Sequence, residues 1–503
     1  MHKDLNDLND ELFDFEVCII GSGPAGLAVA SKLIHENIKF AILESGDISP
    51  NQKHQELNKG FSSGKRKLDL VNSRLRCFGG AGKLWAGVCR PFDTSEFEKV
   101  DSAYGGWPIL FSDLEKFYKE ASSILGLNYD KFFNQDWRDE AYLAVKFKGF
   151  AKTDGILRGV NYQRSPLQKR DLTNQYKDIF FKSKNCTVIT NATVVDFVDS
   201  KKNNFIEKVL IKSISGKQVY LNAKTFVLCA GAIENPRILL DSSLNEDVRS
   251  NKFLGSCFMS HPAFTDSGSL ILNKNLIKPT LKNIDLKRDF GFEMNFKERE
   301  KSLILRHNIS IRPSLNINNK DSNQFSIITD NIRSLVIFSK RVKRKLFGGE
   351  INAKKWILDI AVEQEPRTEN FIKLSNTKDT HGKRQVEIFW DSMSSKEMKT
   401  VLEAVKAVGR ESMLNGVGIT KVSDSLLSKE IFTQDDAINH HIGTTRMATS
   451  SKFGVVDSNL KCFALNNLYI SGSSVFPTSS IVNPTFSIVA LSLRLGEHIV
   501  SQV

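Results

Sequence analysis

Apolar and polar positions near the N-terminus follow the order of a strand, a turn, a helix and a second strand. Residues 14–20 (DFEVCII) are rich in β-forming side chains, and the helix-forming residues 27–35 follow a glycine-rich turn. Residues 38–43 form another apolar run, which predicts the second strand. Dinucleotide-binding domains begin with this arrangement.

The turn between the first strand and the helix reads Gly21-Ser22-Gly23-Pro24-Ala25-Gly26. Gly21 permits the tight turn, Gly23 lets backbone N–H groups approach a pyrophosphate, and Gly26 lets the helix pack closely on the strand. Glu44 follows the second strand, where it is expected to hold the ribose hydroxyls of an adenosine. This carboxylate would repel a ribose 2′-phosphate, so the segment predicts FAD or NAD rather than NADP.

The length of 503 residues predicts two packed domains, or one domain with large insertions. A hydrophobic content of 41% and a charged content of 25% argue against a disordered, fibrous or membrane-spanning chain. The polar N-terminus lacks the basic start and apolar stretch of an export signal, so we expect a cytoplasmic location. The seven cysteines are scattered without a C-x-x-C pair, which predicts reduced structural thiols and no metal site.

The net charge of +13 indicates a basic surface. Because the chain has neither zinc-finger spacing nor an RNA-binding aromatic motif, we expect no nucleic-acid partner. Residues 334–347 (SLVIFSKRVKRKLF) predict a basic helix. A solvated position over the rest of the protein is favoured for it, and contact with an anionic membrane surface is the alternative.

Residues 74–93 (RLRCFGGAGKLWAGVCRPFD) contain a second glycine cluster. Gly79, Gly80 and Gly82 allow a backbone path too tight for side chains, which predicts a flat or charged group lying against it. An ordinary surface loop is the alternative, but such loops rarely carry Leu84 and Trp85 among their glycines. Downstream, residues 104–121 predict a turn and then a helix capped by Ser112.

Two segments near the C-terminus carry candidate chemistry, NHHIGTTRM at 439–447 and NLYISGSSVFPTSSIVNPT at 467–485. In the second segment, residues 468–470 predict a buried strand and Pro484 stands at the favoured first position of a helix. The positive end of that helix would stabilise an anion formed on a flavin.

Removal of a hydride from an alcohol requires that the hydroxyl lose its proton, and histidine is the side chain best suited to accept it near neutral pH. Asparagine can hydrogen-bond the developing alkoxide without titrating. His440, His441 and Asn483 therefore form a candidate catalytic set. The histidines could equally satisfy backbone groups, and Asn483 could serve only as a helix cap, so the residues alone leave both interpretations open.

The motifs together resemble the glucose-methanol-choline (GMC) oxidoreductase family, especially its sugar-oxidising bacterial branch and the pyranose oxidases. Segments in the family's order extend along nearly the whole chain. They are the N-terminal fingerprint, RCFGGAGKLWAG, YGGWPI, FVLCAGAIENPRILL at 226–240, FLGSCFMSHP at 253–262, EQEPRTENFIKLS at 363–375, HHIGTTRM, and the stretch from GSSVFPT to NPT.

This resemblance implies a mixed α/β fold in which a Rossmann-type FAD-binding domain is interleaved with a substrate domain built on an antiparallel sheet. We expect residues 12–100, 186–262 and 435–503 in the FAD-binding domain, and residues 101–185 and 263–434 in the substrate domain. Within the latter, residues 265–330 and 355–392 contain apolar runs that suit strands over the active site.

The resemblance also implies oxidation of a CH–OH group of a sugar or other alcohol, with an electron acceptor that the sequence leaves open. His440 matches the catalytic base of the family's H-x-[hydrophobic]-G-T motif, His441 is the second choice, and Asn483 matches the asparagine of N-P-T. The residues expected to hold FAD are Gly21, Gly23, Pro24, Ala25, Gly26, Glu44, Arg76, Gly79, Gly80, Gly82, Leu84, Trp85, Val195, Ala230, Gly231, Gly472, Ser473, Pro484 and Thr485.

Two positions depart from the family pattern. Leu84 stands where some sugar-oxidising relatives carry a histidine that binds FAD covalently, which predicts noncovalent FAD. Ile481 stands where relatives often have histidine or tyrosine, which predicts a more apolar site. A lyase or decarboxylase on the same scaffold and a nonenzymatic FAD-binding module are the alternative functions. The presence of both His440 and Asn483 argues against the binding module.

Overall fold

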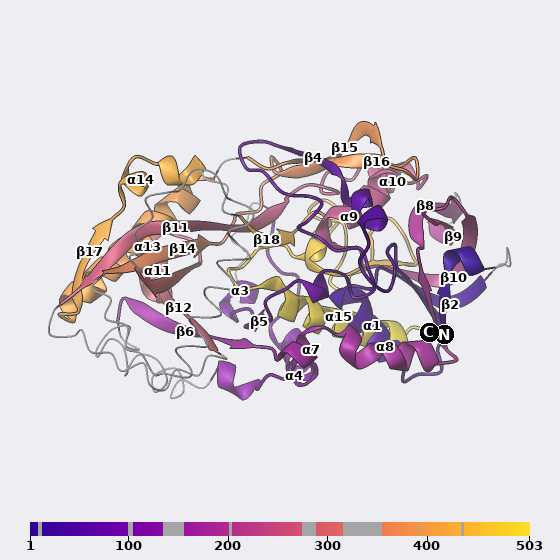
Figure 1. Cartoon of the computed structure of the whole chain (residues 1–503), viewed down its shortest axis with the longest axis horizontal. Coiled ribbons are helices and arrows are strands. Elements are labelled where there is room, and N and C mark those ends of the chain that lie inside the picture. The colour runs from indigo at the N-terminus through magenta and orange to yellow at the C-terminus, as the bar shows by residue number, and fades with distance from the viewer. Residues whose placement is uncertain are drawn as a thin grey trace.

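The computed structural model describes residues 1–8, 13–98, 104–133, 155–200, 204–273, 288–314, 355–391, 393–433 and 437–503. Within these ranges the molecule is elongated, with one large sheet toward each end of its long axis (Figure 1). The mixed fold with a Rossmann-type sheet and an antiparallel sheet, expected from the sequence, is confirmed.

The first sheet contains the βαβ unit predicted from the sequence. β2 (Phe13–Ile20) and β3 (Phe40–Leu43) pair in parallel, and α1 (Pro24–Leu33) connects them. β10 (Gln218–Leu228) pairs in parallel with β2, and β19 (Leu468–Ile470) pairs in parallel with β10. The other described strands of this sheet are β1 (His2–Asp4), β7 (Cys186–Thr190), β8 (Thr193–Ser200) and β9 (Phe205–Lys212).

Helices from distant parts of the chain pack together beside this sheet. α15 (Pro484–Val500) begins at the proline that the sequence places there, and it packs against α1. α4 (Ser112–Leu125) packs against α15, where the Tyr118 and Ser487 hydroxyl oxygens lie 2.7 Å apart. The expectation that Ser112 caps this helix is wrong. Ser112 is already the first helical residue, and the N-cap position belongs to Phe111, whose side chain makes no capping hydrogen bond.

The second sheet is antiparallel and lies toward the other end of the molecule (Figure 1). Its long strand β11 (Met259–Leu272) pairs with β14 (Lys355–Val362) and β17 (Gly418–Val422), and near its start with β18 (Ala437–Ile442). α13 (Ser395–Leu414) lies across this sheet and buries Val401, Val405 and Val408 against it. The sheet also contains β5 (Val88–Cys89), β6 (Leu157–Arg164), β12 (Arg288–Met294) and β13 (His307–Pro313).

A small third sheet consists of β15 (Phe371–Lys378), β16 (Arg384–Phe389) and β4 (Gly60–Ser63). Near it, α9 (Gly231–Leu240) lies between the 229–231 turn and this sheet. The shorter described helices are α2 (Gln52–Gln55), α3 (Ser95–Glu98), α7 (Leu167–Arg170), α8 (Thr173–Lys182), α10 (Glu246–Arg249), α11 (Phe296–Ser302) and α14 (Asp424–Leu427).

Other expectations from the sequence concern the cysteines, membrane-spanning helices, the basic segment and the division into domains. All seven cysteines are buried and none is in a disulfide, as predicted. No helix in the described ranges is both long and apolar enough to cross a membrane. The basic helix expected over residues 334–347 lies outside the described residues. The division of the chain into discontinuous FAD-binding and substrate domains stays a prediction.

Candidate active site

One cavity of about 630 Å³ brings together segments from the whole length of the chain. The N-terminal glycine turn, the second glycine cluster, the 229–231 turn and both C-terminal segments contribute to its wall. Among the residues expected to bind FAD or act in catalysis, all line this cavity except Gly26, Gly79 and Gly82. Gly26 and Gly82 pack directly against the wall residues Gly21 and Pro24, and the Gly79 N–H donates to the hydroxyl of the wall residue Ser22.

The N-terminal glycine turn has the geometry of a phosphate-binding site. Gly21 has a φ of +102°, and a Cβ there would lie 2.7 Å from the carbonyl oxygen of Cys229. At Gly26 a Cβ would collide with the carbonyl oxygen of Gly21. At Gly23, by contrast, a Cβ would meet no protein atom within 4 Å, so the backbone before α1 opens into the cavity. An anionic group can therefore approach the N-terminus of α1.

Glu44 is buried next to this turn at the end of β3. Its carboxylate accepts hydrogen bonds from the Ser22 hydroxyl at 2.5 Å and from the Gly46 N–H at 2.8 Å. Burial raises the pKa of this carboxyl group, and the hydrogen bonds from Ser22 and Gly46 oppose that shift. Each carboxylate oxygen can accept a further hydrogen bond, as the hydroxyls of a ribose would require.

The second glycine cluster packs against the first. A Cβ at Gly80 would lie 3.2 Å from the Cα of Gly23, so these two turns form one continuous wall. The indole N–H of Trp85 donates to the Arg170 carbonyl at 2.8 Å, which holds the segment in place. The neighbouring Leu84 is 54% exposed and lines the cavity.

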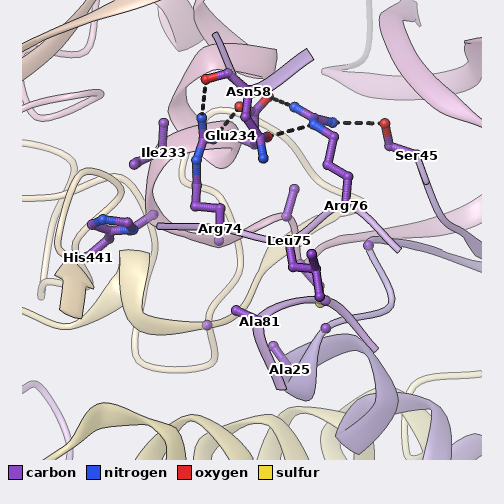
Figure 2. A pocket seen from close by; sticks show the side chains of 18 of the residues that line it. Ala25, Ser45, Asn58, Arg74, Leu75, Arg76, Ala81, Ile233, Glu234 and His441 are labelled. Carbon is purple, nitrogen blue, oxygen red and sulfur yellow. Dashed lines mark hydrogen bonds and ion pairs between the residues drawn. The ribbon is translucent and has the colours of Figure 1, made fainter. Parts of the chain in front are cut away.

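A buried group of arginines and carboxylates, of which the sequence indicated only Arg76, forms another part of the wall (Figure 2). Glu234 on α9 makes ion pairs with Arg74 at 2.5 Å, Arg76 at 2.9 Å and Arg237 at 3.2 Å. Burial by itself would raise the pKa of the Glu234 carboxyl, but the three arginines hold it well below its usual range. Because Arg76 also donates to the Ser45 hydroxyl at 2.8 Å, this group ties the second glycine cluster to α9 and to the end of β3.

Asn235 fixes the 229–231 turn against the C-terminal segment. Its side-chain oxygen accepts from the Ala230 N–H at 2.7 Å, and its amide nitrogen donates to the Ser474 hydroxyl at 2.8 Å. Ser473 in turn donates its hydroxyl to the His441 carbonyl at 2.6 Å. The loop after β19 is thus joined both to α9 and to the strand that carries the histidine pair.

His440 lies between two polar side chains from other parts of the fold. Its Nε2 lies 3.2 Å from the Asn483 amide nitrogen, and its Nδ1 lies 2.8 Å from Nδ1 of His261 on β11. Burial, followed by the neighbouring His261 and His441, holds the pKa of His440 well below its usual value. His440 is therefore neutral near pH 7, with one ring nitrogen available to accept a proton.

His441 has a different environment, although it also lines the cavity. It lies near Arg74 and Ile233 (Figure 2), its ring contacts Phe258, and within the described part of the chain its Nε2 has no hydrogen-bond partner. Burial, with a smaller contribution from Arg74, lowers the pKa of His441 to about 3. It contacts neither His261 nor Asn483 through any described hydrogen bond, so it lies outside the chain of hydrogen bonds that joins His261, His440 and Asn483.

Asn483 occupies the N-cap position of α15 but its side chain makes no capping hydrogen bond, which contradicts the alternative that it serves only as a helix cap. Its amide nitrogen instead faces His440. His261, which lies within FLGSCFMSHP, is a polar neighbour of His440 that was not predicted from the sequence. The signal available was a histidine at the start of a strand, which by itself does not distinguish a structural from a functional residue.

The chain is similar to known oxidoreductases. Residues 366–492 match the family model described as GMC oxidoreductase. The chain is 20% identical to the fructose dehydrogenase large subunit of Gluconobacter japonicus, with 99% of each chain covered. It is also 20% identical to the 2-methyl-1,2-propanediol dehydrogenase of Mycolicibacterium austroafricanum, covering 96% of this chain and 95% of that one.

Among solved structures, that of formate oxidase has the same fold. The TM-score is 0.61, at 14% sequence identity, with 98% of this chain and 99% of that chain covered. The chain is thus similar to GMC oxidoreductases: residues 366–492 match their family model, and the two dehydrogenases align along nearly the whole chain.

Proposed function

We propose that the cavity binds FAD and that the protein oxidises a CH–OH group, with His440 as the base that accepts the hydroxyl proton. The observation that carries the proposal is the arrangement of His440 and Asn483 in the wall of a cavity whose other end has a phosphate-binding turn. The match of residues 366–492, which include His440 and Asn483, to the GMC oxidoreductase model supports it independently.

The residues of the cavity fit FAD. Gly23 leaves open space for a pyrophosphate at the N-terminus of α1, and Glu44 lies where it can accept hydrogen bonds from ribose hydroxyls. Val195, Ala230 and Gly231 would hold the adenine end, while Gly472, Ser473, Pro484 and Thr485 would hold the flavin end near the histidine. When bound, FAD supplies the two-electron oxidant that takes the hydride from the alcohol carbon.

His440 and Asn483 then act on the alcohol oxygen. The Asn483 amide donates a hydrogen bond to it, which orients the hydroxyl toward Nε2 of His440. Nε2 accepts the hydroxyl proton, and the positive charge that forms stays on the imidazole ring. A neutral histidine is needed for this step, and the burial of His440 keeps it neutral near pH 7.

The substrate proposed first is a sugar or another small alcohol. Fructose dehydrogenase and 2-methyl-1,2-propanediol dehydrogenase, to which the chain is similar, are named for a sugar and a diol. Ile481 is buried in the hydrophobic core and is not among the residues that line the cavity, so the expectation that it makes the site more apolar gives no basis for choosing a substrate. We propose that FAD is held noncovalently, because Leu84 replaces the histidine of covalent relatives.

The test is anaerobic mixing of the FAD-loaded protein with a panel of sugars, diols and simple alcohols. Bleaching of the yellow flavin by at least one of them is expected, and reoxidation with oxygen or a dye then identifies the class of electron acceptor. Turnover of a substrate without bleaching would instead indicate a lyase. Acid precipitation should release the flavin into the supernatant, and flavin retained in the pellet would contradict noncovalent binding.

A further inference from the structure

His261 lies directly behind His440, on the side away from Asn483. The two rings come from adjacent strands, β11 and β18, with centroids 4.9 Å apart and planes 87° apart. Their Nδ1 atoms are 2.8 Å apart, and the other ring nitrogen of His261 lies 3.0 Å from the carbonyl oxygen of Ser479. Since His261 is only 1% exposed, these contacts are shielded from water.

The positions of the ring protons follow from these contacts. A carbonyl oxygen only accepts hydrogen bonds, so Nε2 of His261 must carry a proton and donate it to Ser479. A neutral imidazole has one N–H, which leaves Nδ1 of His261 as an acceptor. Burial lowers the pKa of His261 to about 4, so this neutral form holds near pH 7.

The proton on His440 is fixed in turn. Because Nδ1 of His261 accepts, Nδ1 of His440 must be the donor of the 2.8 Å hydrogen bond. Nε2 of the neutral His440 is then unprotonated, and it faces the amide nitrogen of Asn483, which can only donate. Every contact from Ser479 to Asn483 thus pairs one donor with one acceptor, and the reverse tautomers would leave two donors or two acceptors facing each other.

The geometry points to His261 as a positioning residue that fixes the tautomer of His440, so that Nε2 of His440 is the unprotonated nitrogen facing the cavity. This inference rests on the proposed function, in which Nε2 accepts the hydroxyl proton. After that transfer the Nδ1–H of His440 still donates to His261, which stabilises the imidazolium.

The carbonyl at the end of this chain of hydrogen bonds is itself held in place. The Ser479 hydroxyl accepts from the Gln364 N–H at 2.9 Å, and the side-chain oxygen of Gln364 accepts from the Ser260 N–H at 2.8 Å. Gln364 therefore joins Ser260, the residue before His261, to Ser479, whose carbonyl oxygen His261 contacts. Ser480 extends the support by donating its hydroxyl to Glu96 at 2.9 Å.

Few titratable groups face His440 in the described structure. His261 faces it from β11 and His441 from its own strand, while Asn483 at the start of α15 is uncharged. Near neutral pH both neighbouring histidines are neutral, because burial lowers the pKa of each. In this range His261 acts on His440 through its acceptor lone pair and not through charge.

Two variants of the FAD-loaded protein separate this role from simple packing. His261→Leu removes the acceptor, whereas His261→Asn places an amide oxygen close to the position of Nδ1. We expect the leucine variant to slow anaerobic flavin reduction on the order of 10- to 100-fold with FAD still bound, and the asparagine variant to recover much of the loss.

His307→Leu is the matched control. His307 is also buried, its Nε2 accepts from the Met294 N–H at 3.1 Å, and no described contact joins it to His440. Reduction per bound FAD should stay at the wild-type rate in this control. Wild-type reduction rates in His261→Leu, or an asparagine variant slower than the leucine one, would overturn the inference.

The ring nitrogens report the tautomer without any turnover. In holoprotein labelled with 15N-histidine, the His440 signals, assigned through His440→Gln, should show a protonated Nδ1 and an unprotonated Nε2. A protonated Nε2 on neutral His440 would overturn the inference even if His261→Leu failed to fold. If no alcohol bleaches the flavin, the proposed function fails, yet this spectrum still decides the tautomer.

Discussion

The Nε2 atom of His440 lies 3.2 Å from the amide nitrogen of Asn483, across a gap of 43 residues in the sequence. His440 is held by β18 of the antiparallel sheet, and Asn483 by the start of α15 beside the first sheet. Each half of the molecule thus contributes one of the two polar groups. An alcohol oxygen bound between them could donate its proton to the histidine while it accepts a hydrogen bond from the amide.

Replacement of His440 should abolish most of the proton-accepting function. We expect His440→Ala to slow flavin reduction by roughly 100- to 10,000-fold, the usual contribution of a general base, while FAD stays bound. His441→Ala is the matched control on the neighbouring position, and it should change the rate less than about tenfold, since His441 contacts neither Asn483 nor His261 through any described hydrogen bond. Rapid mixing with a substrate measures both rates. The opposite ranking would assign the base to His441.

The pH dependence of flavin reduction should reflect the depressed pKa of His440. A base acts only when unprotonated, so its activity is lost as the pH falls through its pKa in the complex. Burial, with His261 and His441 nearby, holds this pKa well below 6.5. The reduction rate should therefore be maintained as the pH falls from 8 through 6.5 and decline only at lower pH. Stopped-flow measurements across this range check the expectation, and an acidic limb centred at or above pH 6.5 would contradict it.

Asn483→Ala should impair chemistry much more than stability. An asparagine that caps a helix contributes typically about 1 kcal/mol, but the Asn483 side chain makes no capping bond, so a loss below about 0.5 kcal/mol is expected. Loss of the hydrogen bond to the alkoxide should slow reduction roughly 100- to 1,000-fold. The control is Ser394→Ala, which removes the capping box of α13 and should cost about 1 kcal/mol without changing the reduction rate. Denaturant unfolding and rapid mixing distinguish the two effects.

Local patterns were sufficient to predict much of the framework. The apolar run at 14–20 lies within β2, the run at 38–43 contains β3, and Pro484 begins α15. These elements are specified by residues adjacent in sequence, so periodicity and turn chemistry identify them. The motif glycines also lie in or just behind the cavity wall, because a close backbone approach requires glycine at fixed positions along the chain.

Contacts between distant residues were not predictable in this way. His261 and His440 are 179 positions apart, and their hydrogen bond depends on the register between β11 and β18. Glu234 and Arg74 are 160 positions apart, so their ion pair could not be predicted from the sequence. The failed prediction of Ser112 as a cap has a local cause, since α4 begins one residue earlier than expected. Local patterns therefore identify site residues more reliably than their partners.

Two glycines of the N-terminal turn should respond differently to the same substitution. Gly23 has φ −66° and ψ −176°, which alanine can adopt, and a Cβ there would meet no protein atom within 4 Å. Gly23→Ala should fold normally and lose FAD affinity on the order of tenfold or more, because its methyl group occupies the space of the pyrophosphate. Gly26→Ala would force a Cβ against the Gly21 carbonyl and should cost about 1–3 kcal/mol or more in stability. Thermal unfolding of both apoproteins, followed by FAD titration, separates these effects. If Gly23→Ala bound FAD with wild-type affinity, this turn would not be the pyrophosphate site.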